Sequence, residues 1–368
     1  MVVMGRWEGN DWINYKILLI MVSLPYFSID RPTLSHEKDK ENMTTQIKPA
    51  QSQFMRQFRD IVSPLVALVL IMVVIAVLAP TFRSWEAMAN VLENSSVLFI
   101  MCTGMTIALI GGCLDLSVGS IYALVSVCTG QLLINNVPVP LAILGGLFAG
   151  VLCGAVNGLI VTRTGIPTLI ATLGTQLAFR GLANMIGAAK DMSRFPPEFD
   201  MLGSGTWGPM INCIIAFAVI WFILNKTKLG FHAFAIGGNE EVARLAGIPV
   251  NRNKIIYYCL SGLMAALAAI VYTARVDLAQ VNRGQGMELW AIAGVVVGGT
   301  SMFGGVGSVV KTIIGVLIIT VLQTGMIHLH VPSFAQQVAT GVLIIVAVWL
   351  DFVQRRARER VKRTVTAT

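Results

Sequence analysis

The sequence KTKLGFHAFAIGGNEEVARLAGIPVNRNK occupies residues 226–254 and is the longest polar interruption in the second half of a strongly apolar chain. Its centre, Gly237-Gly238-Asn239, predicts a turn that ends in a helix N-cap, because an asparagine side chain accepts hydrogen bonds from the first helical amides. The two glutamates that follow fall in the first helical turn, where the helix dipole favours carboxylates. We therefore expect a short helix here, which we call the docking helix.

The docking helix is expected to be amphipathic. Val242, Leu245 and Ala246 follow its start at i, i+3 and i+4 spacing and therefore share one face. Gly247 and Pro249 are typical helix terminators and set its end. A short amphipathic helix between two apolar runs indicates that something outside the membrane grips it.

Composition identifies the environment of the chain. Of its 368 residues, 55% are hydrophobic and only 12% are charged, whereas soluble domains carry about 25% charged residues. The sequence therefore predicts an all-α, polytopic transmembrane helical bundle in contact with the lipid bilayer. The net charge of +8 is gathered in a few loops, which favours the positive-inside rule over a nucleic-acid partner.

Three segments differ in composition. Residues 1–48 are predicted to be an N-terminal extension, disordered or non-native, with Met43 as the working start; the alternative is an extra interfacial helix. A secretory signal peptide fits poorly, because the segment lacks the small-residue cleavage site that such peptides carry. Residues 49–355 form the transmembrane domain, and residues 356–368 form a basic tail.

About ten apolar runs are long enough to approach the roughly 20 residues that a membrane helix needs. The expected spans are 61–79, 94–111, 118–135, 138–160, 167–188, 207–225, 255–274, 289–303, 308–327 and 335–353. An even number of spans with both ends in the cytoplasm places most basic residues on the cytoplasmic side. The few basic residues left outside are Arg83, Lys190, Arg194, Arg275 and Arg283. This orientation puts the docking helix in the cytoplasm, between the sixth and seventh spans.

Two glycine-rich passages, 111–120 and 298–308, resemble each other, and each joins two apolar runs. Glycine at membrane depth allows close helix packing or a broken helix, and matching breaks are typical of two related halves around a transport path. Tight helix turns are an equally good interpretation. The residues selected in these passages are Gly111, Gly112, Asp115, Ser117, Gly119, Gly298, Gly299, Gly304, Gly305 and Gly307.

Polar residues inside a span are expensive and are therefore candidates for function. Thr172, Gln176, Arg180 and Asn184 recur every four residues on the fifth span, so they lie on one helix face. This α-helical stripe is predicted to line a path for a hydroxyl-rich solute. The alternative is that Arg180 reaches the outer interface and the others form interhelical hydrogen bonds.

Three further polar residues have weaker expectations attached to them. Asn157 in the fourth span is a second candidate for the path. Asp115 is expected to cap the following helix through backbone amides. Glu288 is expected to pair with Arg283 or Arg275 at the outer surface.

Motifs of catalysis and of nucleotide binding are missing from the sequence. No G-x-x-x-x-G-K-[ST] phosphate loop occurs, so ATP has no recognisable site. The six cysteines lie in or beside apolar runs without a C-x-x-C pair, and His328 and His330 have no third ligand beside them. We therefore expect no catalytic residues, no metal site and no cofactor bound by this chain.

Three motifs in order, GGCLDLSVGS, AIGGNEEVARLAGIPVNRNKI and GMELWAIAGVVVGGTSMFGGVGS, resemble the permease subunits of bacterial monosaccharide ABC importers of the ribose, arabinose and xylose type. The resemblance covers about residues 55–355. Leu114 stands where the family usually has isoleucine, and the family has no counterpart to the first forty or so residues. The matching residues of the family's coupling helix are Gly237, Gly238, Asn239, Glu240, Glu241, Ala243, Arg244, Leu245, Ala246 and Gly247.

The resemblance implies a transport machine of several parts. It implies a second permease copy, a cytoplasmic ATPase subunit that binds ATP and magnesium, and a periplasmic solute-binding protein, all at a bacterial inner membrane. A stand-alone secondary transporter or channel remains the main alternative, and an integral membrane enzyme ranks last because no catalytic constellation assembles.

Overall fold

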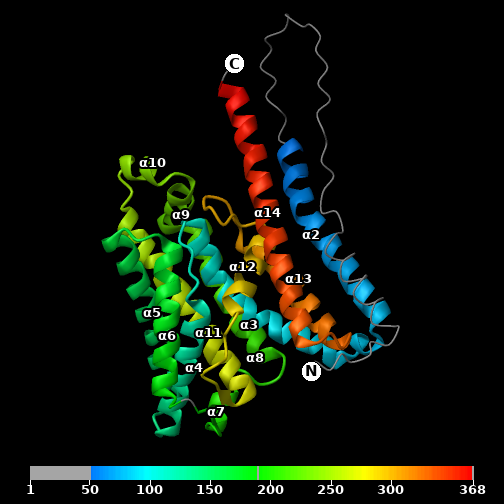
Figure 1. Ribbon diagram of the computed structural model, residues 1–368, viewed down its shortest axis with the longest axis vertical. Helices are drawn as coiled ribbons and strands as arrows, with labels where there is room; N and C mark the ends of the chain where they lie inside the picture. Colours follow the sequence, from blue (N-terminus) through cyan, green and yellow to red (C-terminus); the bar gives the residue numbers. More distant parts are fainter. Residues whose placement is uncertain (1–50, 189, 367–368) are drawn as a thin grey trace, which may run out of the picture.

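The computed structural model describes residues 51–188 and 190–366, and the expectations for residues 1–48 lie outside this part of the chain. The described chain is an all-α bundle, and each of the ten predicted apolar ranges overlaps one helix (Figure 1). These helices are α2 (Gln51–Leu78), α3 (Trp85–Ile110), α4 (Val118–Ile134), α5 (Val139–Thr164), α6 (Thr168–Ile186), α8 (Trp207–Lys226), α11 (Val250–Val276), α12 (Met287–Val297), α13 (Val309–His328) and α14 (Ser333–Thr366).

Shorter elements connect these helices. They are the 3-10 helix η1 (Pro80–Arg83), the helices α7 (Pro197–Asp200), α9 (Lys228–Gly238) and α10 (Glu240–Leu245), and the strands β1 (Met192–Ser193) and β2 (Leu278–Ala279). The two strands pair antiparallel, with Met192 opposite Ala279. This pairing ties the connection after α6 to the connection after α11.

Six helices in the described part of the chain are long and apolar enough to cross a membrane. They are α3, α5, α8, α11, α13 and the Phe334–Val353 portion of α14. Shorter apolar helices add Pro64–Leu78, α4 and α12. The chain is therefore a multi-pass membrane protein, as its composition predicts.

Helix α3 forms the centre of the bundle. Its side chains from Ser95 to Ile110 are buried on every face, and a helix that is apolar all round belongs inside a bundle. Outer helices such as α5 and α8 instead expose large apolar side chains, among them Phe148 and Phe222. A second, smaller core packs α2 and η1 against α13 through residues such as Ile75, Phe82 and Val321.

Helices α5 and α11 approach each other along a stripe of glycines. A Cβ atom on Gly150 would lie 2.5 Å from the carbonyl oxygen of Gly262, and one on Gly154 would lie 2.2 Å from that of Tyr258. Such contacts leave room for no side chain, so the backbones themselves touch, as in the small-residue interfaces of membrane helices. This interface fixes the position of α11, which follows the docking helix in the chain.

The connections gather at two ends of the bundle (Figure 1). One end holds α9, α10 and the second glycine passage, where the amide of Gly305 donates to the carbonyl oxygen of Ile110 over 2.9 Å. The opposite end holds α7, the β1–β2 pair and the start of α3.

Several predicted boundaries need correction. The eighth span was expected over 289–303, but α12 ends at Val297, because Gly299 and Gly304 adopt left-handed backbone angles and the passage continues as a loop. Gly237 and Gly238 were expected in a turn, but they form the last residues of α9. Helix α14 continues without a break past residue 355 to Thr366.

Candidate functional site

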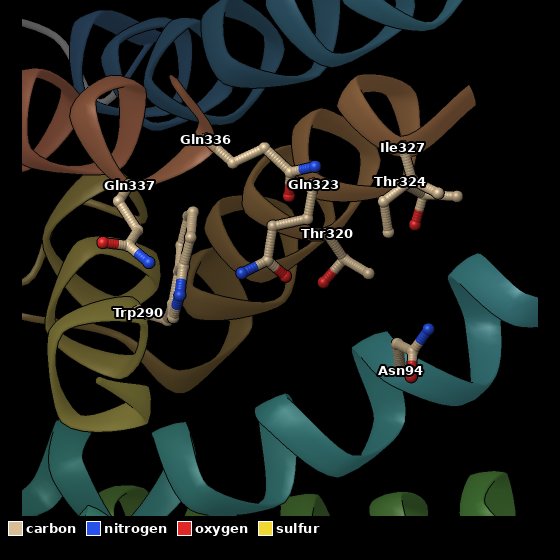
Figure 2. A pocket seen from close by; sticks show the side chains of 8 residues that line it. All are labelled: Asn94, Trp290, Thr320, Gln323, Thr324, Ile327, Gln336 and Gln337. Carbon is tan, nitrogen blue, oxygen red and sulfur yellow. The ribbon is translucent and has the colours of Figure 1, made fainter. Parts of the chain in front are cut away.

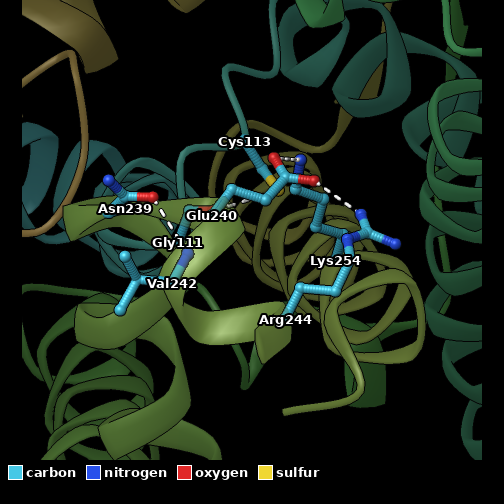
Figure 3. Close-up of polar contacts among 7 residues, drawn as sticks. All are labelled: Gly111, Cys113, Asn239, Glu240, Val242, Arg244 and Lys254. Carbon is cyan, nitrogen blue, oxygen red and sulfur yellow. Dashed lines mark hydrogen bonds and ion pairs between the residues drawn. The ribbon is translucent and has the colours of Figure 1, made fainter. Parts of the chain in front are cut away.

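The docking helix α10 forms as its sequence predicts. Asn239 is extended, and its side chain accepts a hydrogen bond from the Val242 amide over 3.0 Å (Figure 3). The same extended residue ends α9, so a single asparagine separates the two helices. After Leu245 the chain turns at Gly247, whose φ of +80° suits glycine. Helix α10 therefore stands as a short, capped unit at one end of the bundle.

Glu240 attaches α10 to the bundle. Its carboxylate lies 2.6 Å from Lys254 Nζ at the start of α11 and 3.0 Å from Arg244 Nη2 within α10 (Figure 3). Lys254 is mostly buried, with 13% of its side chain exposed. Partial burial raises the pKa of Glu240, but the bonds and charges of Lys254 and Arg244 outweigh it, so this pKa lies below the ordinary carboxyl value.

The outer face of α10 is apolar and exposed. Leu245 is 88% exposed and Val242 is 60% exposed, whereas Ala243 points inward and is buried. In the sequence, Val242 follows Glu241 and Leu245 follows Arg244, so charged residues flank both apolar ones. An apolar face rimmed by charge is typical of a surface that a partner covers.

Gly237 is wedged between the two glycine passages. A Cβ atom at this position would lie 1.9 Å from the carbonyl oxygen of Ile110 and 2.3 Å from the amide nitrogen of Gly305. The end of α9 therefore touches the end of α3 on one side and the loop after α12 on the other. No flexible side chain separates these backbones, so any displacement of the end of α9 would press directly on both segments.

Both glycine passages end a helix by the same hydrogen bonds. The amides of Gly111, Gly112 and Cys113 donate to carbonyl oxygens four, three and five residues back, and those of Gly298, Gly299 and Thr300 repeat the pattern. The second glycine of each pair is left-handed, with φ of +72° and +86°. This is the capping arrangement in which a left-handed glycine satisfies the last helical carbonyls.

The two passages differ beyond these caps. In the first, Gly119 already belongs to α4, and its Cα faces Gly284 and Glu288 so closely that a Cβ would lie 2.4 Å from the Gly284 carbonyl oxygen. In the second, Gly304 and Gly305 are left-handed and Gly307 still precedes α13. The similarity of the two passages is therefore local to the helix ends.

Asp115 lies fully buried in the first passage at the centre of a polar cluster. Its Oδ1 accepts from the Ser117 amide over 3.0 Å and from the Ser117 hydroxyl over 2.7 Å, and its Oδ2 accepts from the Ser261 hydroxyl over 2.9 Å. The amide of Asn157 donates to both Ser117 Oγ and Asp115 Oδ1. Asp115 does accept from a backbone amide at the start of α4, as expected, but it also joins α5 and α11.

The polar residues of α6 all bond within the chain. Thr172 donates to the carbonyl oxygen of Thr168, and Gln176 Nε2 donates to Glu288 Oε1 over 2.9 Å. Arg180 donates to the carbonyl oxygens of Val281 and Arg283 at 2.9 and 2.8 Å and to that of Gly119 at 3.2 Å. Asn184 donates to the carbonyl oxygen of Arg180. Gln176 and Arg180 thus hold the connection between β2 and α12, whereas Thr172 and Asn184 bond within α6.

The expected pairing of Glu288 with Arg275 or Arg283 is wrong. Glu288 is buried and accepts from Gln176, and Arg275 instead forms an ion pair with Glu93 at 2.7 Å. Arg283 stacks on the ring of Tyr272 at 4.3 Å from its centroid and bonds its hydroxyl. Sequence spacing missed these partners because Gln176 and Glu93 lie more than a hundred residues away.

Two adjoining cavities lie at the end of the bundle opposite α10. Their volumes are about 390 and 310 Å³, and they share Asn94 of α3, Trp290 of α12 and Gln323 of α13 as lining residues. The larger one is also lined by Gln336 and Gln337 of α14 (Figure 2). These cavities were not predicted from the sequence, because their lining residues come from helices that are far apart in the chain.

In the part of the chain that the structure describes, no group of three metal-ligating side chains assembles. His328 Nδ1 lies 3.0 Å from the hydroxyl of Thr81 and packs on Phe82 instead. The six cysteines are free.

Helices long and apolar enough to cross a membrane, with a short exposed helix at one end, indicate a multi-pass membrane protein. The chain belongs to the family described as branched-chain amino acid transport system / permease component, whose profile matches residues 87–348. It is 38% identical over 294 residues to the ribose import permease protein of Bacillus subtilis (strain 168), covering 78% of this chain and 91% of that protein.

Two further relatives agree with this membership. The ribose import permease protein of Escherichia coli (strain K12) is 37% identical over 317 residues, covering 84% of this chain and 99% of that protein. The D-allose transport system permease protein of the same strain is 36% identical over 290 residues, covering 77% of this chain and 89% of that protein. No solved structure matches the chain.

Proposed function

We propose that this chain is the permease subunit of an ATP-driven, binding-protein-dependent ABC importer that carries a monosaccharide or related polyol into the cytoplasm. The observation that carries the proposal is the exposed apolar face of α10, with Leu245 88% exposed, in a chain similar to ribose and allose permeases. The chain has no phosphate loop of its own. A partner ATPase that binds ATP and magnesium would therefore supply the energy.

The coupling residues form one mechanical unit in this proposal. The ATPase grips α10 by Val242 and Leu245, and Glu240 passes its displacement to Lys254 of α11. Gly237 passes the same displacement to both glycine passages. Closure of the ATPase around ATP would then switch the side of the membrane to which the solute path opens.

The monosaccharide assignment comes from the relatives. The family description names branched-chain amino acids, but the similar permeases named above are for ribose and D-allose. Thr172, Gln176, Arg180, Asn184 and Asn157 are proposed to border the path. In this conformation the α6 stripe does so through the 281–288 segment, which it holds by hydrogen bonds.

The membrane topology completes the proposal. Ten spans in two related halves, with both termini in the cytoplasm of a bacterial inner membrane, place α10 and most basic loops on the cytoplasmic side. Two permease copies would share the ATPase, and a periplasmic binding protein would deliver solute to the opposite end. Large apolar side chains on the outer helices, such as Phe148 and Phe222, suit contact with lipid or with the second copy.

Reconstitution tests this function. Proteoliposomes that hold the permease with its ATPase should accumulate labelled D-ribose or D-allose only when ATP and the binding protein are both supplied. Uptake by this chain alone, driven by an ion gradient, would contradict the proposal and favour a stand-alone secondary transporter.

A further inference from the structure

We propose that the two adjoining cavities at the end opposite α10, which we call the outer cavities, are where the permease receives a neutral sugar. Trp290 would stack on the sugar ring, and the amides of Gln323, Gln337 and Asn94 would bond its hydroxyls. The inference rests on the proposed importer function and adds a binding site to it. Its location differs from the α6 stripe that the sequence selected.

The outer cavities hold hydrogen-bonding groups that the described chain leaves unused. The side-chain amides of Gln323 and Gln337 and the indole N–H of Trp290 bond no other described residue, although all three line the larger cavity. By contrast, Gln176 and Arg180 of α6 already bond Glu288 and backbone carbonyls. Trp290 and Gln323 are half-buried and Gln337 is exposed, so all three groups are accessible to a polar ligand in the cavity.

Asn94 is oriented by a neighbouring charge. Its Oδ1 accepts from Arg275 Nη1 over 2.9 Å, and Arg275 is itself held by Glu93. The acceptor side of this amide is therefore occupied, and its Nδ2 remains as a donor. The cavity wall thus offers one fixed donor besides the two glutamines, which can each donate and accept.

The chemistry of the lining favours a neutral polyol. In the view of Figure 2 the Trp290 indole lies between the side chains of Gln337 and Gln323. A sugar presents an apolar C–H face that suits an aromatic ring, and its hydroxyls donate and accept as amides do. No charged side chain lines the larger cavity among the described residues. The smaller cavity is lined by Arg283, which stacks on Tyr272 and bonds its hydroxyl, but no carboxylate lines either cavity among the described residues, so the ammonium group of an amino acid would find no partner there.

The position of the outer cavities also fits delivery from outside. Asn94, Trp290 and Gln323 lie near the ends of α3, α12 and α13 that face away from α10. In the proposed orientation this is the periplasmic end, where the binding protein would release solute. The volumes of 390 and 310 Å³ fall within the range of about 300–1,000 Å³ that is typical of small-molecule sites.

Thiol labelling of the assembled importer tests this site. In right-side-out vesicles, Gln337→Cys should react with a membrane-impermeant thiol reagent above the wild-type background, and D-ribose should slow the reaction several-fold. Trp85→Cys at the same end, where Trp85 is 79% exposed, should react without protection by ribose. Labelling of Gln337→Cys that ribose leaves unchanged, or no labelling from the outside, would overturn the inference.

A second pair of variants guards against misfolding. In the Gln337→Cys background, Trp290→Ala should raise the half-protecting ribose concentration about tenfold, the loss expected for one aromatic contact. Trp290→Phe keeps a ring and should raise it less. If neither Trp290 variant changes the half-protecting ribose concentration while ATP-dependent ribose uptake persists, the proposed site is wrong and the importer function stands. If the wild-type importer shows no ATP-dependent ribose uptake, the proposed function itself is wrong.

Discussion

Gly237 at the end of α9 and Gly305 in the loop after α12 touch backbone to backbone. A Cβ atom on Gly237 would lie 2.3 Å from the amide nitrogen of Gly305, whose hydrogen bond to Ile110 closes the contact. Three segments from distant parts of the chain therefore meet at one point beside the docking helix. The contact links a surface element to the helices of the bundle without an intervening side chain.

Substitution of Gly237 tests that contact. Gly237→Ala should destabilise the protein by about 1–3 kcal/mol, the usual cost of overpacking, because backbone atoms cannot move aside cheaply. Gly238→Ala is the matched control, since a Cβ there meets nothing within 4 Å. Thermal unfolding in detergent measures both, and equal midpoints for the two variants would contradict the wedge.

The Glu240–Lys254 pair should hold α10 in place. Lys254→Met removes the cation and should speed hydrogen exchange of the α10 amides about two- to fivefold, since partly exposed pairs contribute up to about 1 kcal/mol. Arg252→Met removes an exposed cation nearby and should leave the exchange unchanged. Equal protection in wild type and Lys254→Met would show that packing alone fixes the helix.

The same pair predicts a dependence on acid. The pKa of Glu240 lies below its ordinary value of 4.5, so its stabilisation is complete above the ordinary value and is lost as pH falls through the folded-state pKa. A fluorophore on Leu245→Cys should therefore gain mobility only below the ordinary value, as its anisotropy reports. With Glu240→Gln added, the mobility should already be high at pH 7, and a loss of anisotropy above pH 6 in the parent would contradict this account.

Asp115 should be essential to the joint of α4, α5 and α11. Asp115→Ala leaves the buried donors of Ser117 and Ser261 without their acceptor, at a cost of about 1–3 kcal/mol for each unpaired group, whereas Asn157 keeps its bond to Ser117 Oγ. Asp115→Asn keeps an oxygen acceptor and should cost less. Asp191→Ala, which removes an exposed hydrogen bond to Gln280, should change the unfolding midpoint little, and a similar small effect of Asp115→Ala would contradict the role of the cluster.

Local signals predicted the helices and the docking element. Long apolar runs can satisfy their backbone in lipid only as helices, and the Asn239 cap with its following glutamates depends on neighbouring residues alone. The polar partnerships were beyond such reasoning. The hydrogen-bond partner of the Glu288 carboxyl group, Gln176, is set by tertiary packing against α6. The apolar run that predicted the eighth span also does not reveal that α12 ends at Val297. The outer cavities likewise combine residues of five helices, α3, α11, α12, α13 and α14.

The most direct measurement of the central claim is ATP-dependent ribose uptake by the complete importer with Leu245→Asp in the permease. Leu245 is 88% exposed, so the substitution should leave membrane insertion and unfolding temperature unchanged while it abolishes both uptake and co-purification of the ATPase subunit. Glu241→Lys, on the same helix, should act in the same direction. Normal uptake and normal ATPase binding by a well-inserted Leu245→Asp variant would contradict the assignment of α10 as the coupling helix.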